Sequence, residues 1–198
     1  GTDVGPSGSG TLGAAPTDGN SDSFTYDPRD PVPTLWCRTL FTEPSNRRKL
    51  EHRADILYYR TPPLTEDIEI AGYPVVHLHA SSSSPDTDFF ARLIDEHPNN
   101  GAAIEICYGM IRARYRNGLD KEDQLEPNTV YEFTIRLGAT ANRFHKGHRI
   151  RLEITSSDYP NHDRNHNVGR NDLADTELRI AEQRIFHGRT HTSRLVLP

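Results

Sequence analysis

Cysteine is scarce in this chain, whose 198 residues contain only Cys37 and Cys107. Two widely separated cysteines cannot build the disulfide framework of a small secreted domain or the thiolate cluster of a structural zinc site. Cys107 lies within an apolar strand pattern, and we expect it to be a small buried hydrophobe. A single bridge between the two cysteines is left open. The low cysteine content favours a cytoplasmic location, with secretion as the alternative.

Long apolar runs and an excess of basic charge are also missing. No run approaches the roughly 18 apolar residues of a membrane-spanning helix, and the chain from Gly1 lacks the basic-then-apolar pattern of a signal peptide. The net charge is −5, with 23 basic residues scattered among 28 acidic ones. We therefore expect neither membrane nor nucleic acid as a partner. The densest basic run, at 47–53, is interrupted by Glu51 and predicts a solvated face.

The motifs of covalent catalysis are absent as well. An α/β-type serine hydrolase needs Gly-x-Ser-x-Gly, which exposes the serine on a sharp turn, and the nearest approach, GPSGS at 5–9, lacks the last glycine. Neither cysteine has the histidine and asparagine context of a thiol nucleophile. We therefore assign no catalytic residue, and whether the chain is an enzyme in its own right is left open.

Histidine is plentiful, with ten in the chain, but its spacing does not match a metal centre. A pair such as His77 and His79 places both imidazoles on one face of a strand, as metal-binding cupins require. A cupin would then have a glutamate where this chain has Ser83 and Ser84. The pairs at 162/166 and 187/191 fall in predicted loops or at a strand end, and no twelve-residue calcium loop is present. We expect no metal site and no cofactor.

Short strand signals dominate what the chain does contain. Residues 1–23 are rich in Gly, Ser, Thr, Asp and Pro and predict a flexible linker or arm, whereas residues 24–198 are predicted to form one domain. Three prolines between Tyr26 and Leu35 require an extended segment, which should wrap the domain surface. The strand candidates are 55–60, 68–70, 74–80, 88–95, 104–115, 129–137, 149–155, 182–187 and 194–197. One short helix is predicted at 173–180.

The periodicity within these segments predicts an all-β fold. Tyr131, Phe133 and Ile135 share one face of their strand, with polar residues opposite, and Val76 and Leu78 do the same in theirs. Half-buried antiparallel sheets have this alternation. We therefore predict a jelly-roll β-sandwich with long loops and an extended N-terminal arm.

The most informative stretch is 148–169, where an alternating strand runs into a long polar loop. Ile150, Leu152 and Ile154 fall on one face and charged residues on the other, as in a strand with one buried side. The following loop has too little apolar surface to fold by itself, so it is either a solvated turn or is ordered by hydrogen bonds or a partner. With the Ser-rich turn at 81–88 it provides a candidate domain-interface or ligand site: Asp158, Tyr159, Asn161, Asp163, Arg164, Asn165, Asp86 and Asp88.

Four segments, taken in order, resemble the C-terminal domain of the X-Pro dipeptidyl-peptidase and cocaine esterase (CocE/NonD) family of serine hydrolases. They are FTYDPRDPVPTL at 24–35, the segment 55–93 that begins DILYYRTPP, the segment 145–167 that contains GHRIRLEITSSDYPNHDRN, and RLVL at 194–197. The ordered series is more specific than any single motif. The resemblance implies a galactose-binding-like jelly roll that follows an α/β-hydrolase domain with its catalytic triad and a helical cap.

The sequence departs from the family pattern in two places. Trp36 and Cys37 stand where relatives usually have a glycine pair, so the chain direction there is expected to differ. Members normally also have a further strand just upstream of the Gly-rich segment. We therefore expect this chain to be a fragment, or one part, of a larger hydrolase.

Three functions compete. The leading one is a non-catalytic β-domain that packs on an α/β-hydrolase catalytic domain, in the same or a separate chain, and helps shape its acyl-substrate pocket; a homo-oligomer is also compatible. The second is a carbohydrate-binding module that uses Tyr159 beside Asp158, Asn161 and Arg164, an interpretation that rests on fold analogy. The third is a metal-dependent cupin-like enzyme. Whether the parent acts on esters, amides or X-Pro peptides is not encoded in this chain.

Overall fold

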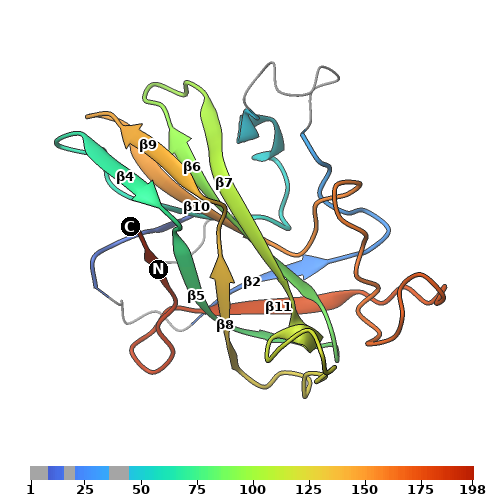
Figure 1. Cartoon of the computed structure of the whole chain (residues 1–198). Coiled ribbons are helices and arrows are strands. Elements are labelled where there is room, and N and C mark those ends of the chain that lie inside the picture. Colours follow the sequence, from blue (N-terminus) through green and yellow to red (C-terminus); the bar gives the residue numbers. More distant parts are fainter. Residues whose placement is uncertain (1–8, 16–20, 36–44) are drawn as a thin grey trace.

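The computed structural model describes residues 9–15, 21–35 and 45–198. Regular structure in these ranges is almost entirely β (Figure 1). The strands are β1 Ser9–Thr11, β2 Ser21–Tyr26, β3 Leu57–Arg60, β4 Ile68–Gly72, β5 Val75–Ser82, β6 Asp88–Glu96, β7 Ala103–Arg112, β8 Tyr131–Arg136, β9 Thr140–Phe144, β10 Arg149–Thr155, β11 Ala181–Phe186 and β12 Arg194–Val196, and the 3₁₀ helices are η1 Arg47–Leu50 and η2 Ala113–Tyr115. None of the helices in this part of the chain is long and apolar enough to cross a membrane.

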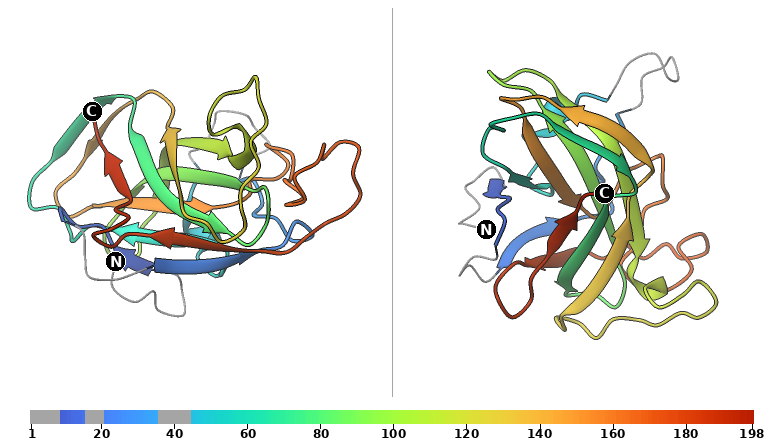
Figure 2. Two further views of the ribbon diagram at one scale, coloured as in Figure 1. Left: turned by 90° about the horizontal axis from the view of Figure 1, so that it is seen from below. Right: turned by 60° about the vertical axis from the view of Figure 1, so that its left-hand side comes forward.

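The described strands form a two-layer sandwich with a small two-stranded sheet at one end. One sheet has the order β1-β3-β10-β6-β7, and the other has the order β12-β5-β11-β2, with β8 on the second edge of β5. β4 and β9 pair only with each other. The two larger sheets stack as layers (Figure 2), and apart from the parallel pair β1 and β3 their strands are antiparallel. The predicted β-sandwich is confirmed.

Each predicted strand segment contains a strand, but β1, β2 and β9 were not anticipated. β2 pairs along its whole length with β11, and it begins before the domain boundary expected at residue 24. β1 lies inside the stretch expected to be an arm, and it pairs with β3. Phe24 and Tyr26 of β2 are buried in the core, so two large side chains anchor a strand in an otherwise polar sequence.

The short helix predicted at 173–180 is wrong. Residues 172–174 form a turn, in which Asn171 O accepts hydrogen bonds from the amides of Ala174 and Asp175 at 3.0 Å each. Leu173 is 84% exposed and Ile180 is 51% exposed. A helix of two turns depends on burying an apolar face, and these side chains have no such contact.

The outer face of β10 is buried too, although its sequence predicted one buried side. Arg151 and Glu153 point away from the core and are 0% exposed, because the segment 45–55 lies over them. Arg47, from the basic run predicted to be solvated, is 1% exposed, and its Nε donates to Glu153 at 2.9 Å. Arg151 donates to Glu153 at 2.7 Å and to Glu96 at 3.2 Å. We call Arg47, Glu51, Glu96, Arg151 and Glu153 the β10 ion cluster.

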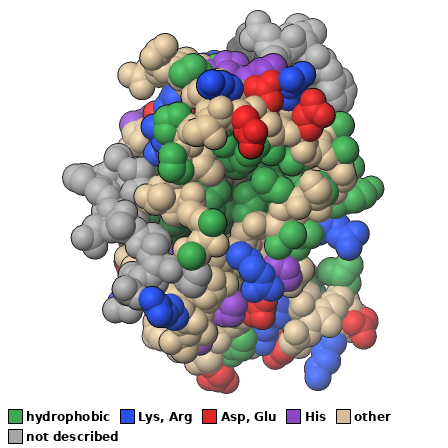
Figure 3. Space-filling model, turned by 90° about the vertical axis from the view of Figure 1, so that its left-hand side faces the viewer, with side chains coloured by type: hydrophobic (Ala, Val, Ile, Leu, Met, Phe, Trp, Pro, Cys, Tyr) green, Lys and Arg blue, Asp and Glu red, His purple; other side chains and the backbone are tan. Residues whose placement is uncertain are grey.

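One side of the sandwich is hollowed. On the left-hand side of Figure 1, apolar side chains line a depression in the surface (Figure 3). A cavity of about 610 Å³ lies there, lined by Leu78 and Ile185 from one sheet, Ile150 and Leu152 from the other, and Leu12. Part of the interior between the sheets is therefore open.

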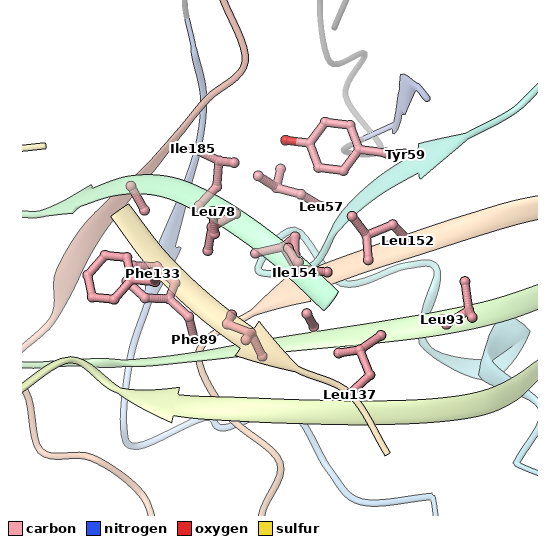
Figure 4. Packing of buried hydrophobic residues seen from close by; sticks show 14 of the residues in the cluster. Leu57, Tyr59, Leu78, Phe89, Leu93, Phe133, Leu137, Leu152, Ile154 and Ile185 are labelled. Atoms are coloured by element: carbon pink, nitrogen blue, oxygen red, sulfur yellow. The ribbon is translucent and has the colours of Figure 1, made fainter. Parts of the chain in front are cut away.

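Beside this hollow, the two sheets share one apolar core (Figure 4). Phe89 and Phe133 are 0% exposed, with ring centroids 5.0 Å apart. Ile154 is fully buried, and Leu152 lies near it from the same strand. The predicted core face of β10 is confirmed, as is the inward face of β8 that carries Phe133 and Ile135.

Cys107 is buried in this core, as its sequence context predicted. It is 8% exposed, and burial raises the pKa of its thiol to about 11, with a smaller contribution from the nearby Glu105 carboxylate. The thiol is therefore protonated and unreactive near neutral pH. Trp36 and Cys37, and with them the open question of a disulfide bridge, lie outside the described residues.

Candidate functional site

The polar loop after β10 is clamped to the proline-rich segment of the same chain. Tyr159 N donates to Val32 O at 2.9 Å, and Thr34 N donates to Tyr159 O at 2.8 Å. Ser157 Oγ accepts from Val32 N at 2.8 Å. Proline restrains the backbone of the proline-rich segment. Pairing with this restrained segment therefore fixes the path of the loop as it leaves β10. The extended proline-rich segment was predicted, and its docking partner is this loop.

Asp158 is turned inward, toward the first sheet. It is 3% exposed, and its carboxylate lies 3.0 Å from the guanidinium of Arg92 in β6. It also accepts hydrogen bonds from Thr34 Oγ1 at 3.1 Å and from Asn161 Nδ2 at 2.9 Å. Asn161 also donates to the hydroxyl of Tyr108 at 3.0 Å. Two predicted site residues, Asp158 and Asn161, thus meet in one network within the domain.

Asn165 joins the two acidic residues of the Ser-rich turn. Its amide Nδ2 donates to Asp86 at 2.8 Å and to Asp88 at 2.9 Å, and all three residues are at most 1% exposed. Arg114 donates to Asp86 at 2.9 Å, and Arg112 holds Asp88 with two bonds of 2.9 Å each. The structure therefore brings Asn165 together with Asp86 and Asp88, which lie 79 and 77 residues earlier in the sequence, and all three were assigned to one candidate site.

Burial raises the pKa of Asp86 to about 6, despite the hydrogen bonds and the positive charge that oppose the shift. Desolvation is the largest cause, and the neighbouring Asp88 carboxylate also raises the pKa, while Asn165 and Arg114 lower it. A carboxyl group removed from water is more easily protonated because its charged form loses hydration. Asp86 therefore changes charge in mildly acidic solution.

The variant Asp86→Asn should remove one component of the pH dependence of stability. Because the folded pKa lies above the ordinary value of 3.8, the stability linked to this group is fully present below pH 4 and is lost as the pH rises through about 6. Between those limits the wild type should lose about 2–3 kcal/mol relative to the variant. Urea unfolding of both proteins at several pH values measures this difference, and parallel pH profiles would contradict it.

The remaining candidate residues face outward. Tyr159 is 41% exposed, and Asp163 is exposed. Arg164 is half-buried: its guanidinium lies 5.1 Å from the Tyr159 ring centroid and donates to Pro28 O at 3.1 Å. The exposed surface formed by Tyr159, Pro160, Asp163 and Arg164 is named the loop tip.

Sequence reasoning missed the arginines that hold the site. Arg92, Arg112 and Arg114 come from β6, β7 and η2, and each pairs with an acidic residue of the site. Arg92 is only 2% exposed. An arginine within an otherwise apolar strand was the available signal, because such a residue is seldom buried without a carboxylate partner.

Among the described residues, one group of side chains has the arrangement of a metal site: Asp95, His97 and His148. It lies away from the polar loop and includes none of the histidine pairs tested by spacing. His77 and His79 instead face Glu132, at 3.3 and 3.9 Å.

The fold and the polar loop agree with one family of protein domains. Residues 5–196 match the family of the X-Pro dipeptidyl-peptidase C-terminal non-catalytic domain. The match spans nearly the whole chain, so the protein belongs to this family. The resemblance predicted from four ordered sequence segments is confirmed.

Individual relatives are hydrolases that are longer than this chain. Cocaine esterase from Rhodococcus sp. (strain MB1 Bresler) is 40% identical over 200 residues, which cover 96% of this chain and 34% of that protein. The structure of an α-amino acid ester hydrolase has a TM-score of 0.84 at 29% identity, covering 91% of this chain and 32% of that one. An aminopeptidase from a marine sediment Thaumarchaeota archaeon has a TM-score of 0.87 at 28% identity, covering 98% and 35%. The chain thus spans about one third of the length of each of these three relatives.

Proposed function

We propose that this chain serves as the non-catalytic β-sandwich of a larger serine hydrolase that cleaves acyl esters or peptides. It would pack on an α/β-hydrolase catalytic domain and help to shape the substrate pocket. The match to the non-catalytic family over residues 5–196 carries this proposal. The sequence supports it because no Gly-x-Ser-x-Gly motif is present.

The loop tip is the surface we assign to this contact. Its base is rigid, because Asp158 and Asn165 are buried and hydrogen-bonded within the domain. Its outer side presents an aromatic ring, a carboxylate and a guanidinium, which are groups that suit a partly polar interface between domains. In this arrangement the buried residues position the loop, and the exposed residues meet the partner.

The variant Tyr159→Ala should weaken the association between this chain and its catalytic domain about ten-fold, because interfacial tyrosines are frequent energetic anchors. Calorimetric titration of the two separately produced parts measures the affinity, and ester turnover of the joined protein provides a second readout. Lys121→Ala, at an exposed position in another loop, is the matched control. Equal affinity for the wild type and Tyr159→Ala would show that the loop tip is not part of the interface.

A fluorophosphonate probe labels activated serines, so it tests whether the nucleophile belongs to the catalytic domain and not to this chain. We expect no label on this chain and label on the catalytic domain. A labelled serine in this chain would overturn the non-catalytic assignment.

The carbohydrate-binding alternative is not favoured. Of the residues proposed to bind a sugar, Asp158 and Asn161 use their polar groups in hydrogen bonds within the domain. The Arg164 guanidinium lies over the Tyr159 ring. A sugar would find few free hydrogen-bonding groups at this surface.

The cytoplasmic location remains a prediction from the low cysteine content.

A further inference from the structure

Two histidines and one aspartate meet at one end of the sandwich. Asp95 lies near the end of β6, His97 follows that strand, and His148 directly precedes β10. The three possible ligand atoms all lie within 4.8 Å of one another. His148 Nδ1 is 2.9 Å from Asp95 Oδ1, and His97 Nε2 is 3.8 Å from Asp95 Oδ2. Two segments, the end of β6 and the turn before β10, therefore converge on one small polar site.

The backbone of this site is already fixed. His97 N donates to Ala102 O at 2.8 Å and closes the turn between β6 and β7. His148 is held on both sides, because its N donates to His145 O at 3.0 Å and its O accepts from Leu64 N at 2.8 Å. Small side-chain rotations would suffice to bring the three ligand atoms to a common centre.

The negative charge of Asp95 favours a cation at this site. The Asp95 side chain is 10% exposed, and its ion-pair contacts within the described residues are the two imidazoles. Unlike a guanidinium, an imidazole carries no permanent positive charge, so neither contact is a fixed cation beside this carboxylate. The two imidazole rings lie side by side, with centroids 4.5 Å apart and planes tilted by 35°. A divalent cation would be coordinated by the carboxylate and by one nitrogen of each ring together.

We propose that Asp95, His97 and His148 bind a zinc-type transition-metal ion. Two imidazole nitrogens and one carboxylate oxygen are ligands that Zn²⁺ takes at about 2.0–2.2 Å, with a fourth position left for water. Mg²⁺ and Ca²⁺ prefer oxygen ligands and are not expected to compete. The bound ion would tie the turn between β6 and β7 to the turn between β9 and β10, independently of any partnership with a catalytic domain.

Zinc titration of the full chain without an affinity tag tests the site. By calorimetry at pH 7.5, we expect one zinc ion per chain and no binding of Mg²⁺. The variant His97→Ala should weaken zinc binding roughly ten-fold or more, because changing even an outer-shell partner typically costs that much. His52→Ala, which removes an exposed histidine elsewhere, should bind zinc as the wild type does.

The melting temperature provides a second readout. Zinc should raise the melting temperature of the wild type and of His52→Ala, but should raise that of His97→Ala much less at the same concentration. The His97 side chain is 40% exposed, so its removal should leave the fold intact, which circular dichroism verifies. Absence of saturable zinc binding, or equal zinc affinity of wild type and His97→Ala, would overturn the proposal.

Discussion

Arg151→Met should lower the free energy of unfolding by about 3–5 kcal/mol, because it removes a fully buried cation that contacts three carboxylates and leaves Glu153 with Arg47 as its remaining partner. Arg151 is 0% exposed, and it pairs with Glu153 at 2.7 Å and with Glu96 at 3.2 Å, and also with Glu51. Methionine retains much of the packing of the arginine stem but supplies no charge. Chemical denaturation at neutral pH measures the loss.

Two further variants serve as controls for Arg151→Met. Arg143→Met removes a surface pair with Asp67, in which the arginine side chain is 55% exposed, and should cost less than about 1 kcal/mol. Combining Arg151→Met with Glu153→Gln should restore part of the stability, since the carboxylate that has lost one of its two cations is then neutral. If Arg151→Met behaved like Arg143→Met, the outer face of β10 would have to be hydrated.

Asn165→Ala is expected to cost about 2–4 kcal/mol. The Asn165 amide donates to both Asp86 and Asp88, and its Oδ1 accepts from Asn167 N at 2.8 Å. Hydrogen bonds to buried charged groups are worth about 1.5–3 kcal/mol each, and truncation leaves those carboxylates less satisfied. Urea unfolding measures the cost.

Hydrogen exchange distinguishes a local effect from a global one in this variant. The amide of Asn167 should exchange faster in Asn165→Ala, because it loses its acceptor. Asp163→Ala, an exposed change in the same loop, should alter stability by no more than about 0.5 kcal/mol. An unaltered exchange rate for Asn167 would show that Asn165 does not hold the loop.

The strands could be predicted because apolar and polar residues alternate along each of them, and this local pattern indicates which face is buried. Ile150, Leu152 and Ile154 identify the core face of β10 without knowledge of any partner. The opposite face could not be read in this way, because Arg151 and Glu153 resemble a solvated surface until the segment that covers them is known. β2 was missed for a related reason: its partner β11 lies at the other end of the chain.

Sequence reasoning grouped some of the side chains that the structure brings together, but it did not predict which way they face. Asp86, Asp88 and Asn165 were expected to belong together, and they share hydrogen bonds. Polarity alone cannot tell whether a side chain faces its own domain or a partner, since both environments satisfy it. The arginines that settle this point, Arg92 and Arg114, are far from the loop in sequence.

The pairing of β2 has a consequence for how the protein is made. Among the described strands, the ladder partner of β2 is β11, residue for residue from Ser21 with Phe186 to Tyr26 with Ala181. A ribosome adding about 5–20 residues per second needs roughly eight to thirty seconds to cover the intervening chain. Throughout that interval β2 has no strand to pair with, and its aromatic side chains stay without a finished core. The second sheet can therefore close only after β11 has been synthesised, and until then the nascent chain is open to chaperones and to misassembly.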